Sequence, residues 1–146
     1  MMVNPQREVR SLVKRIKANP MHFWIGLGMI GIGVWLSLND NYFTWPPGLR
    51  DFANEDAVDM LFVVTGISMV VWTLDDCRTP TWDHVQLVVA AMLLSALTMY
   101  QFCHWVVTGA PMPWVSNGVI TAYVVILAKR SDSGHAMAGP DTQINK

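Results

Sequence analysis

The fold of this chain is decided by residues 84–128, which read HVQLVVAAMLLSALTMYQFCHWVVTGAPMPWVSNGVITAYVVILA. The run contains no Asp, Glu, Lys or Arg, and Asp83 and Lys129 flank it. One straight helix of this length would extend about 67 Å at about 1.5 Å per residue, whereas the hydrocarbon core of a bilayer is about 30 Å thick. The run must therefore fold back, and we expect the reversal at Thr108-Gly109-Ala110-Pro111-Met112-Pro113. These residues predict a helical hairpin inside a membrane.

The composition agrees with a membrane environment. Hydrophobic residues make up 52% of the 146 residues and charged residues only 14%, whereas a soluble domain usually carries about 25% charged residues. This surface has too little charge to face water on all sides. The low content of charged residues therefore predicts the lipid bilayer as a partner. The net charge of -1 gives no reason to expect a nucleic-acid partner.

Residues 21–128 predict an all-α, polytopic transmembrane domain with four transmembrane helices. The expected spans are residues 21–38, 57–74, 84–107 and 113–128. The fourth span has only about 15 strongly apolar residues, or about 22 Å of helix. It must therefore thin the bilayer locally or let Lys129 and Arg130 snorkel back to the headgroups. No small-x-small cleavage site follows the first span, so we expect a retained signal anchor.

Residues 1–20 predict a cytoplasmic, basic, amphipathic helix that lies on the membrane surface. Val9, Leu12, Val13 and Ile16 share one helical face, and basic residues fill the remainder. A frayed basic tail that only sets topology is the alternative. Asn19-Pro20 should end this helix before the first span. Residues 129–146 are polar and predict a disordered cytoplasmic tail.

The distribution of Lys and Arg predicts the orientation. With four spans both termini lie on one side, and that side collects nine of the basic residues, whereas the loop of residues 39–56 on the other side carries only Arg50. The positive-inside rule therefore predicts that both termini are cytoplasmic. Tryptophans at span ends fit the same frame as membrane-interface residues, with Trp24, Trp72 and Trp82 at the inner interface and Trp35, Trp105 and Trp114 at the outer one.

Glycines of the first span form the sequence G-x-G-x-x-G from Gly26 to Gly31. A dinucleotide site would need a preceding strand and an acidic residue in a βαβ unit, and neither fits a membrane span. Small residues instead allow helices to approach closely in lipid. Gly28 and Gly31 share one face, and Gly26 and Gly33 share another. We predict helix packing there, within the monomer or between copies, with Gly66 of the second span on a partner surface.

Candidate sites of chemistry are few. Asp59 lies at the start of the second span, where an exposed acid favoured by the helix dipole is the preferred interpretation and a proton or ion site the alternative. His22, His84 and His104 lie at span ends with no metal-ligand spacing. Cys77 and Cys103 are expected on opposite sides of the membrane, too far apart for a disulfide. We therefore predict no catalytic residues, no cofactor, no metal site and no enzymatic activity.

Polar residues of the last two spans could form a seam. Ser95 and Thr98 lie in the third span, and Ser116, Asn117 and Thr121 lie in the fourth. They could hydrogen-bond between helices or line a wet path in an assembly, and the sequence leaves both open.

The chain resembles small multi-span phage or prophage membrane proteins, and holins among these, in general design. The resemblance lies in Met21-His22-Phe23-Trp24-Ile25-Gly26-Leu27-Gly28, in Pro113-Trp114-Val115-Ser116-Asn117-Gly118, and in the basic Lys129-Arg130. It implies a location in the bacterial inner membrane of a host cell and a homo-oligomer that assembles there and permeabilises it, with the glycine face of the first span as the assembly surface. Two other functions stay open: a structural or regulatory membrane subunit that binds a protein partner, and a small channel or transporter.

Overall fold

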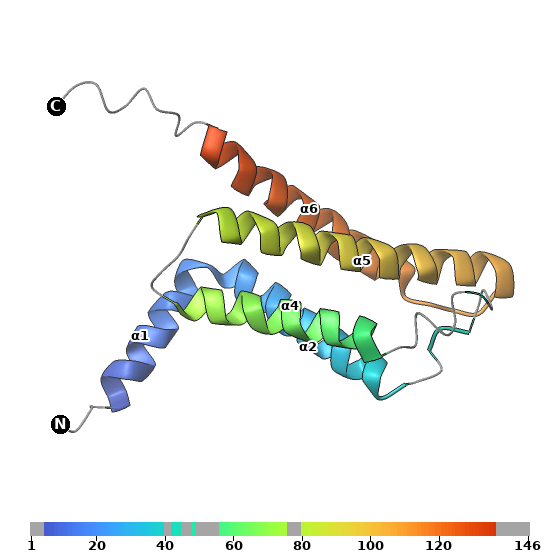
Figure 1. Ribbon diagram of the computed structural model, residues 1–146, viewed down its shortest axis with the longest axis horizontal. Coiled ribbons are helices and arrows are strands. Elements are labelled where there is room, and N and C mark those ends of the chain that lie inside the picture. The colour runs from blue at the N-terminus through green and yellow to red at the C-terminus, as the bar shows by residue number, and fades with distance from the viewer. Residues whose placement is uncertain (1–4, 40–41, 45–47, 49–55, 76–79, 137–146) are drawn as a thin grey trace. The chain divides into compact units, whose positions relative to one another are not determined.

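The computed structural model describes residues 5–39, 42–44, 48, 56–75 and 80–136. Five helices make up the secondary structure of these residues, which confirms the all-α class there. The chain divides into two compact units, residues 1–78 and 79–146, each of which is described by itself. Figure 1 shows two long helices running side by side in each unit. Most of the predicted outer loop, including Trp45 and Arg50, lies outside the described residues, as does Cys77.

The first unit contains three helices, α1 (Pro5–Ala18), α2 (Pro20–Ser37) and α4 (Asp56–Leu74). The break expected at Asn19-Pro20 is confirmed, because Asn19 has φ -137° and Pro20 opens α2. Proline suits the first helical position, where its missing N–H would have no intrahelical partner. α2 packs along α4, while α1 touches both near one end and points away from them (Figure 1).

The second unit is the hairpin predicted from the uncharged run. Its helices are α5 (Pro80–Thr108) and α6 (Trp114–Ala136), which pack against each other. The reversal falls where it was expected. Gly109 adopts φ 71°, a conformation that glycine takes without steric cost, and its N–H donates to the carbonyl of Trp105 at 2.9 Å. Pro111 and Pro113 then keep the chain out of the helix before Trp114.

The end of α6 differs from the prediction that a disordered tail begins at residue 129. The helix continues past Ala128, through Lys129 and Arg130, to Ala136. One reason is a hydrogen bond from the Ser131 hydroxyl to the Asp83 carboxylate (2.8 Å), which holds the first turn of this extension against α5. Residues 137–146 lie outside the described part of the chain.

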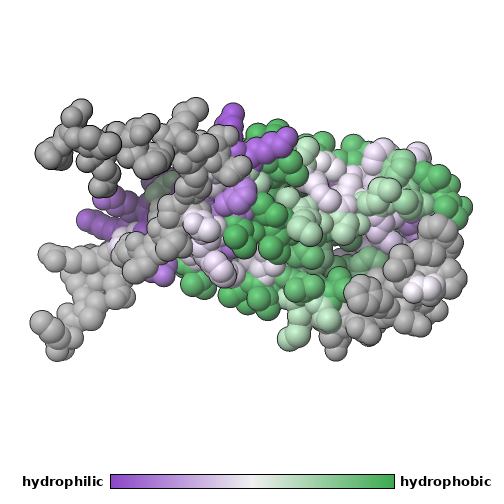
Figure 2. Space-filling model, turned by 45° about the horizontal axis from the view of Figure 1, so that its top comes forward, coloured by the Kyte–Doolittle hydropathy of each residue, from purple (hydrophilic) through white to green (hydrophobic). Residues whose placement is uncertain are grey.

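Three helices of the described residues are long and apolar enough to cross a membrane: α2, the part of α4 from Ala57 to Leu74, and the part of α5 from Thr81 to Thr108. α6 is not among them, because its apolar part ends at Ala128 before two basic residues. Large hydrophobic side chains are exposed on all four long helices, among them Leu27, Val34, Met60, Val64, Met92, Met99, Val119 and Ile126. Figure 2 shows hydrophobic residues over much of the visible surface. These helices mark the chain as a membrane protein.

Candidate functional site: helix-packing surfaces and an apolar groove

Glycines form the contact between α2 and α4. The buried residues of α2 repeat at intervals of three and four, and therefore share one helical face: Gly26, Met29, Gly33 and Leu36. The face of α4 that is buried contains Asp59, Phe62, Thr65, Gly66, Met69 and Thr73. Two of the predicted packing glycines of α2 and the predicted glycine of α4 thus lie in the contact.

The two backbones approach so closely that no side chain fits at these glycines. A Cβ atom on Gly66 would lie 2.5 Å from the carbonyl oxygen of Gly26, and one on Gly26 would lie 2.8 Å from that of Gly66. A Cβ on Gly33 would lie 2.7 Å from the carbonyl oxygen of Asp59. A Cβ atom essentially never lies closer than 3.0 Å to such a neighbouring atom. The close packing of α2 on α4 therefore requires a glycine at each of these three positions.

Gly28 and Gly31 lie on the other side of α2. Within the described part of the first unit, no atom outside the neighbouring backbone of α2 itself lies within 4 Å of the position that a Cβ would take at either glycine. Trp24 and Trp35 are spaced four residues before Gly28 and four after Gly31, so the four residues share one face. The two tryptophan side chains are 64% and 60% exposed. Within its own unit α2 thus has one glycine face that is packed and a second, the open Trp24–Trp35 face, that is not.

Asp59 is buried, and the expectation of an exposed acid is wrong. Only 9% of its surface is accessible. The cause is the approach of Gly33, which brings α2 against the backbone of α4 at this residue. Asp59 therefore belongs to the packed face of α4, although it lies only three residues after the start of that helix.

The end of α4 is tied to the two preceding helices. The guanidinium of Arg15 in α1 donates to the backbone carbonyl of Leu74, the last residue of α4. A cation suits this place because the helix C-terminus carries the negative end of the helix dipole. His22 of α2 lies beside Trp72 of α4, with ring centroids 5.1 Å apart. The Arg15 contact thus joins α1 to the end of α4, and the ring contact joins α2 to α4 near the same end.

Polar side chains join α5 to α6 within the apolar run. The Asn117 side-chain amide donates to the Gln101 side-chain oxygen at 2.8 Å, and the hydroxyls of Thr98 and Thr121 are 3.1 Å apart. Ser116 instead bonds to the carbonyl of Pro113 in its own chain segment. Three residues of the predicted seam thus make hydrogen bonds between helices. Sequence reasoning missed Gln101, although it is polar, uncharged and three residues from Thr98.

The open end of this hairpin carries a second set of bonds. The carbonyl of Ala128 lies 3.2 Å from Nδ1 of His84, and because a carbonyl oxygen only accepts, Nδ1 carries the proton. Next to it is the hydrogen bond from Ser131 to Asp83, since Asp83 precedes His84 and Ser131 lies three residues after Ala128. His104, by contrast, is buried near the turn and contacts the hydroxyl of Thr108 through Nδ1 at 3.2 Å.

An aromatic cluster closes the turn end. Trp114 packs on Phe102 and on Trp105, with centroids 5.2 and 5.4 Å apart. Trp105 is exposed, Trp114 is half-buried, and of the tryptophans predicted at the other interface Trp82 is exposed and Trp72 half-buried. Such partly exposed rings at helix ends suit a headgroup region.

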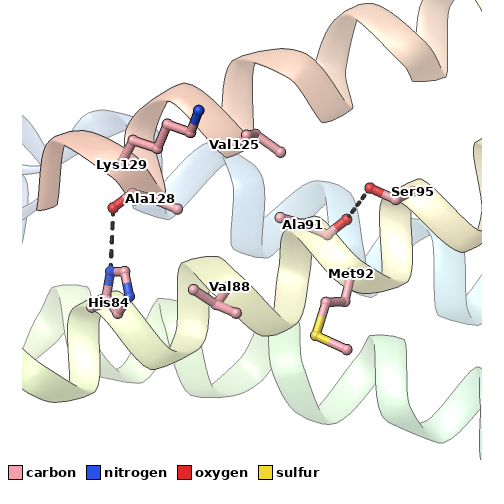
Figure 3. Close-up of a pocket in the computed structure, with 8 residues that line it drawn as sticks. All are labelled: His84, Val88, Ala91, Met92, Ser95, Val125, Ala128 and Lys129. Atoms are coloured by element: carbon pink, nitrogen blue, oxygen red, sulfur yellow. Dashed lines mark hydrogen bonds between the residues drawn. The ribbon is translucent and has the colours of Figure 1, made fainter. Parts of the chain in front are cut away.

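Two grooves follow one another along the α5–α6 hairpin, and Ser95 lines both. The first has a volume of about 520 Å³ and extends from His84 and Lys129 to Ser95; Val88, Ala91, Met92, Val125 and Ala128 complete its lining (Figure 3). We call it the His84–Lys129 groove. The second, of about 610 Å³, extends from Ser95 toward Phe102 and Trp114. Both are lined mainly by apolar groups.

Other side chains offer little chemistry. Within the described ranges no three His, Cys, Asp or Glu side chains come together in a way that could hold a metal ion. Cys103 has a free, half-buried thiol.

Comparison with known proteins finds no matching family model, no matching curated protein and no matching solved structure.

Proposed function

We propose that this chain is a four-span membrane protein that self-assembles in the bacterial inner membrane and permeabilises it, as holins do. α2, α4 and α5 supply three spans, and the part of α6 up to Ala128 supplies a short fourth. α1 lies on the cytoplasmic surface of the membrane. Support for this topology comes from the basic residues, since four spans place nine of the ten Lys and Arg residues on the side of the termini.

The observation that carries the proposal is the open Trp24–Trp35 face of α2. One glycine face of this helix is already used by α4, and the second has no neighbour within the described part of the first unit. In lipid, apolar side chains gain nothing by exchanging lipid for protein, so helix association depends on close backbone approach and hydrogen bonds. Gly28 and Gly31 offer such an approach to the α2 helix of another copy.

Induced expression in bacteria tests the permeabilising function. The wild-type chain is expected to accumulate without effect and then to depolarise the membrane abruptly, which a potential-sensitive dye and culture density report. Normal growth at high levels of the chain in the membrane would refute the proposal.

The variant Gly28→Leu/Gly31→Leu tests the assembly face. We expect it to abolish crosslinked oligomers and depolarisation while the chain remains in the membrane, because leucine side chains there keep two α2 backbones apart. The matched control, Leu27→Phe/Val34→Leu, enlarges two exposed side chains of α2 beside this face and should keep both properties. Oligomers that persist in the glycine variant would contradict the interface.

A structural or regulatory subunit that anchors a protein partner is the second candidate. The observation that favours it is the attachment of α1 to α4 through Arg15, because it fixes the position of a helix with exposed Arg10, Lys14 and Lys17. A stoichiometric partner that co-purifies in mild detergent with the wild-type chain and is lost from Arg10→Glu/Lys14→Glu would support this function.

The topology has its own test. A protease site placed after Lys146 should be resistant to protease added to intact cells and should be cut in inverted vesicles. Cleavage from outside intact cells would overturn the four-span topology.

A further inference from the structure

We propose that the His84–Lys129 groove binds an anionic phospholipid, with one acyl chain along α5 and α6 and the phosphate beside Lys129 and His84. The inference rests on the membrane location proposed above, and concerns the second unit alone.

The polar groups of the groove gather at one end. His84 from α5 and Lys129 from α6 both line this end (Figure 3). Toward the other end the walls are Val88, Met92 and Val125. Ser95 lines the far end, but its hydroxyl donates to the carbonyl of Ala91 at 2.6 Å, so the α-helix already satisfies it. A ligand that fits this lining has a polar head at one end and a hydrocarbon chain behind it.

The dimensions fit one leaflet. From His84 to Ser95 the helix rises by about 16 Å, at about 1.5 Å per residue. Half of a hydrocarbon core of about 30 Å is about 15 Å. The floor of the groove is made by the small side chains of Ala91 and Ala128, both buried between the helices. An acyl chain that lies on this floor therefore ends near the middle of the bilayer, where Ser95 lies.

The charge at the head end selects the lipid. Lys129 is an exposed residue and belongs to the lining, and Lys near a membrane surface attracts anionic lipid headgroups. His84 donates from Nδ1 to Ala128, which holds its ring at the mouth of the groove. Arg130, the basic residue that follows Lys129, is also exposed but is not part of the lining. A phosphatidylglycerol fits this charge pattern better than a zwitterionic lipid with the same chains.

Native mass spectrometry of the whole chain in mild detergent tests the site by titration with phosphatidylglycerol and with phosphatidylcholine of identical chains. Flotation of the chain with vesicles first checks its membrane location, so failure of the lipid site and failure of the membrane location are distinguished. We expect one phosphatidylglycerol to bind at least fivefold more tightly than phosphatidylcholine. Equal occupancy by both lipids would overturn the proposal.

Two pairs of variants locate the lipid. Lys129→Gln should weaken phosphatidylglycerol binding about fivefold, whereas Arg130→Gln, the matched control outside the lining, should not. Ser95→Leu should fill the far end of the groove and weaken binding of both lipids about tenfold, whereas Ala96→Leu, on the exposed neighbouring residue, should have no effect. Circular dichroism checks that all four variants keep their helices. Equal effects within either pair would place the lipid elsewhere and refute the groove as its site.

Discussion

The two helical pairs of this chain solve the same problem in different ways. α2 and α4 pack most closely at three glycines, which have no side chain to keep the backbones apart: Gly26, Gly33 and Gly66. α5 and α6 are joined where polar side chains meet, at Gln101–Asn117 and Thr98–Thr121. In lipid the hydrophobic effect does not drive helices together, so dispersion contacts at short range and hydrogen bonds remain as the main attractive interactions. Each pair uses mainly one of them.

The difference predicts opposite sensitivities. The α2–α4 pair should tolerate changes of polarity at its edges but no added volume at its glycines. The α5–α6 pair has ordinary van der Waals spacing at Gly118, since a Cβ there would lie 3.6 Å from Cγ2 of Thr98. It should therefore tolerate an added methyl group but not the loss of one partner of a hydrogen bond.

The largest effect is expected from Gly66→Ala. The new Cβ would lie 2.5 Å from the carbonyl oxygen of Gly26 and 2.8 Å from the backbone nitrogen of Ile30, and neither backbone atom can move without displacing α2. We expect the free energy of unfolding of the first unit to fall by about 2–3 kcal/mol. SDS titration in mixed micelles measures it, with the ring contact between His22 and Trp72 as the probe of the first unit.

Gly118→Ala and Gly31→Ala are the controls for this volume effect. The first adds the same methyl group to the other pair at a normal contact distance, and the second adds it to the open face of α2. Both should leave stability unchanged or raise it by less than about 1 kcal/mol, because alanine has the higher helix propensity. A loss of stability in Gly118→Ala equal to that in Gly66→Ala would remove the distinction between the pairs.

An intermediate effect is expected from Gln101→Leu. It leaves the Asn117 amide without its acceptor inside the hairpin. Hydrogen bonds between membrane helices contribute about 0.6 kcal/mol on average and about 1.7 at most, so we expect a loss of about 1 kcal/mol in the free energy of unfolding. The double variant Gln101→Leu/Asn117→Leu removes both partners and should recover part of that loss.

Ser116→Ala is the matched control, because the Ser116 hydroxyl bonds within its own chain segment. It should change stability by less than about 0.5 kcal/mol. A double-mutant cycle gives the coupling energy of Gln101 and Asn117 directly, and a value near zero would show that this bond does not hold α5 to α6.

Much of the fold could be predicted from periodicity and charge. The reversal at residues 108–113 follows from the length of the uncharged run and from its Gly and Pro residues, and the break at Asn19-Pro20 follows from proline chemistry. The described helices lie within a few residues of the predicted segments, apart from the extension of α6. That extension depends on a hydrogen bond between residues 83 and 131, a long-range contact that local sequence does not contain.

The packing surfaces were harder to assign. Sequence spacing separates Gly26 and Gly33 from Gly28 and Gly31, but both pairs are equally small, so only the position of α4 decides which face is packed. Asp59 was misjudged for a related reason. A charge near a helix start is favourable in isolation, and its burial depends on how closely Gly33 of another helix approaches. Gln101 could have been found from the sequence, because it lies three residues after Thr98 and therefore on the same face of α5.

The smallest effect is expected from Arg15→Gln, which concerns how the first unit holds α1. Arg15 donates to the carbonyl of Leu74 at the C-terminus of α4, and a cation at a helix C-terminus contributes about 0.3–1 kcal/mol. The substitution keeps a donor but removes the charge, so hydrogen exchange in α1 should accelerate about threefold while that of α2 and α4 stays unchanged. Lys14→Gln, on an exposed neighbour, removes the same charge from α1 and serves as control. If both variants accelerated exchange equally, α1 would be held by its overall charge and not by the contact with α4.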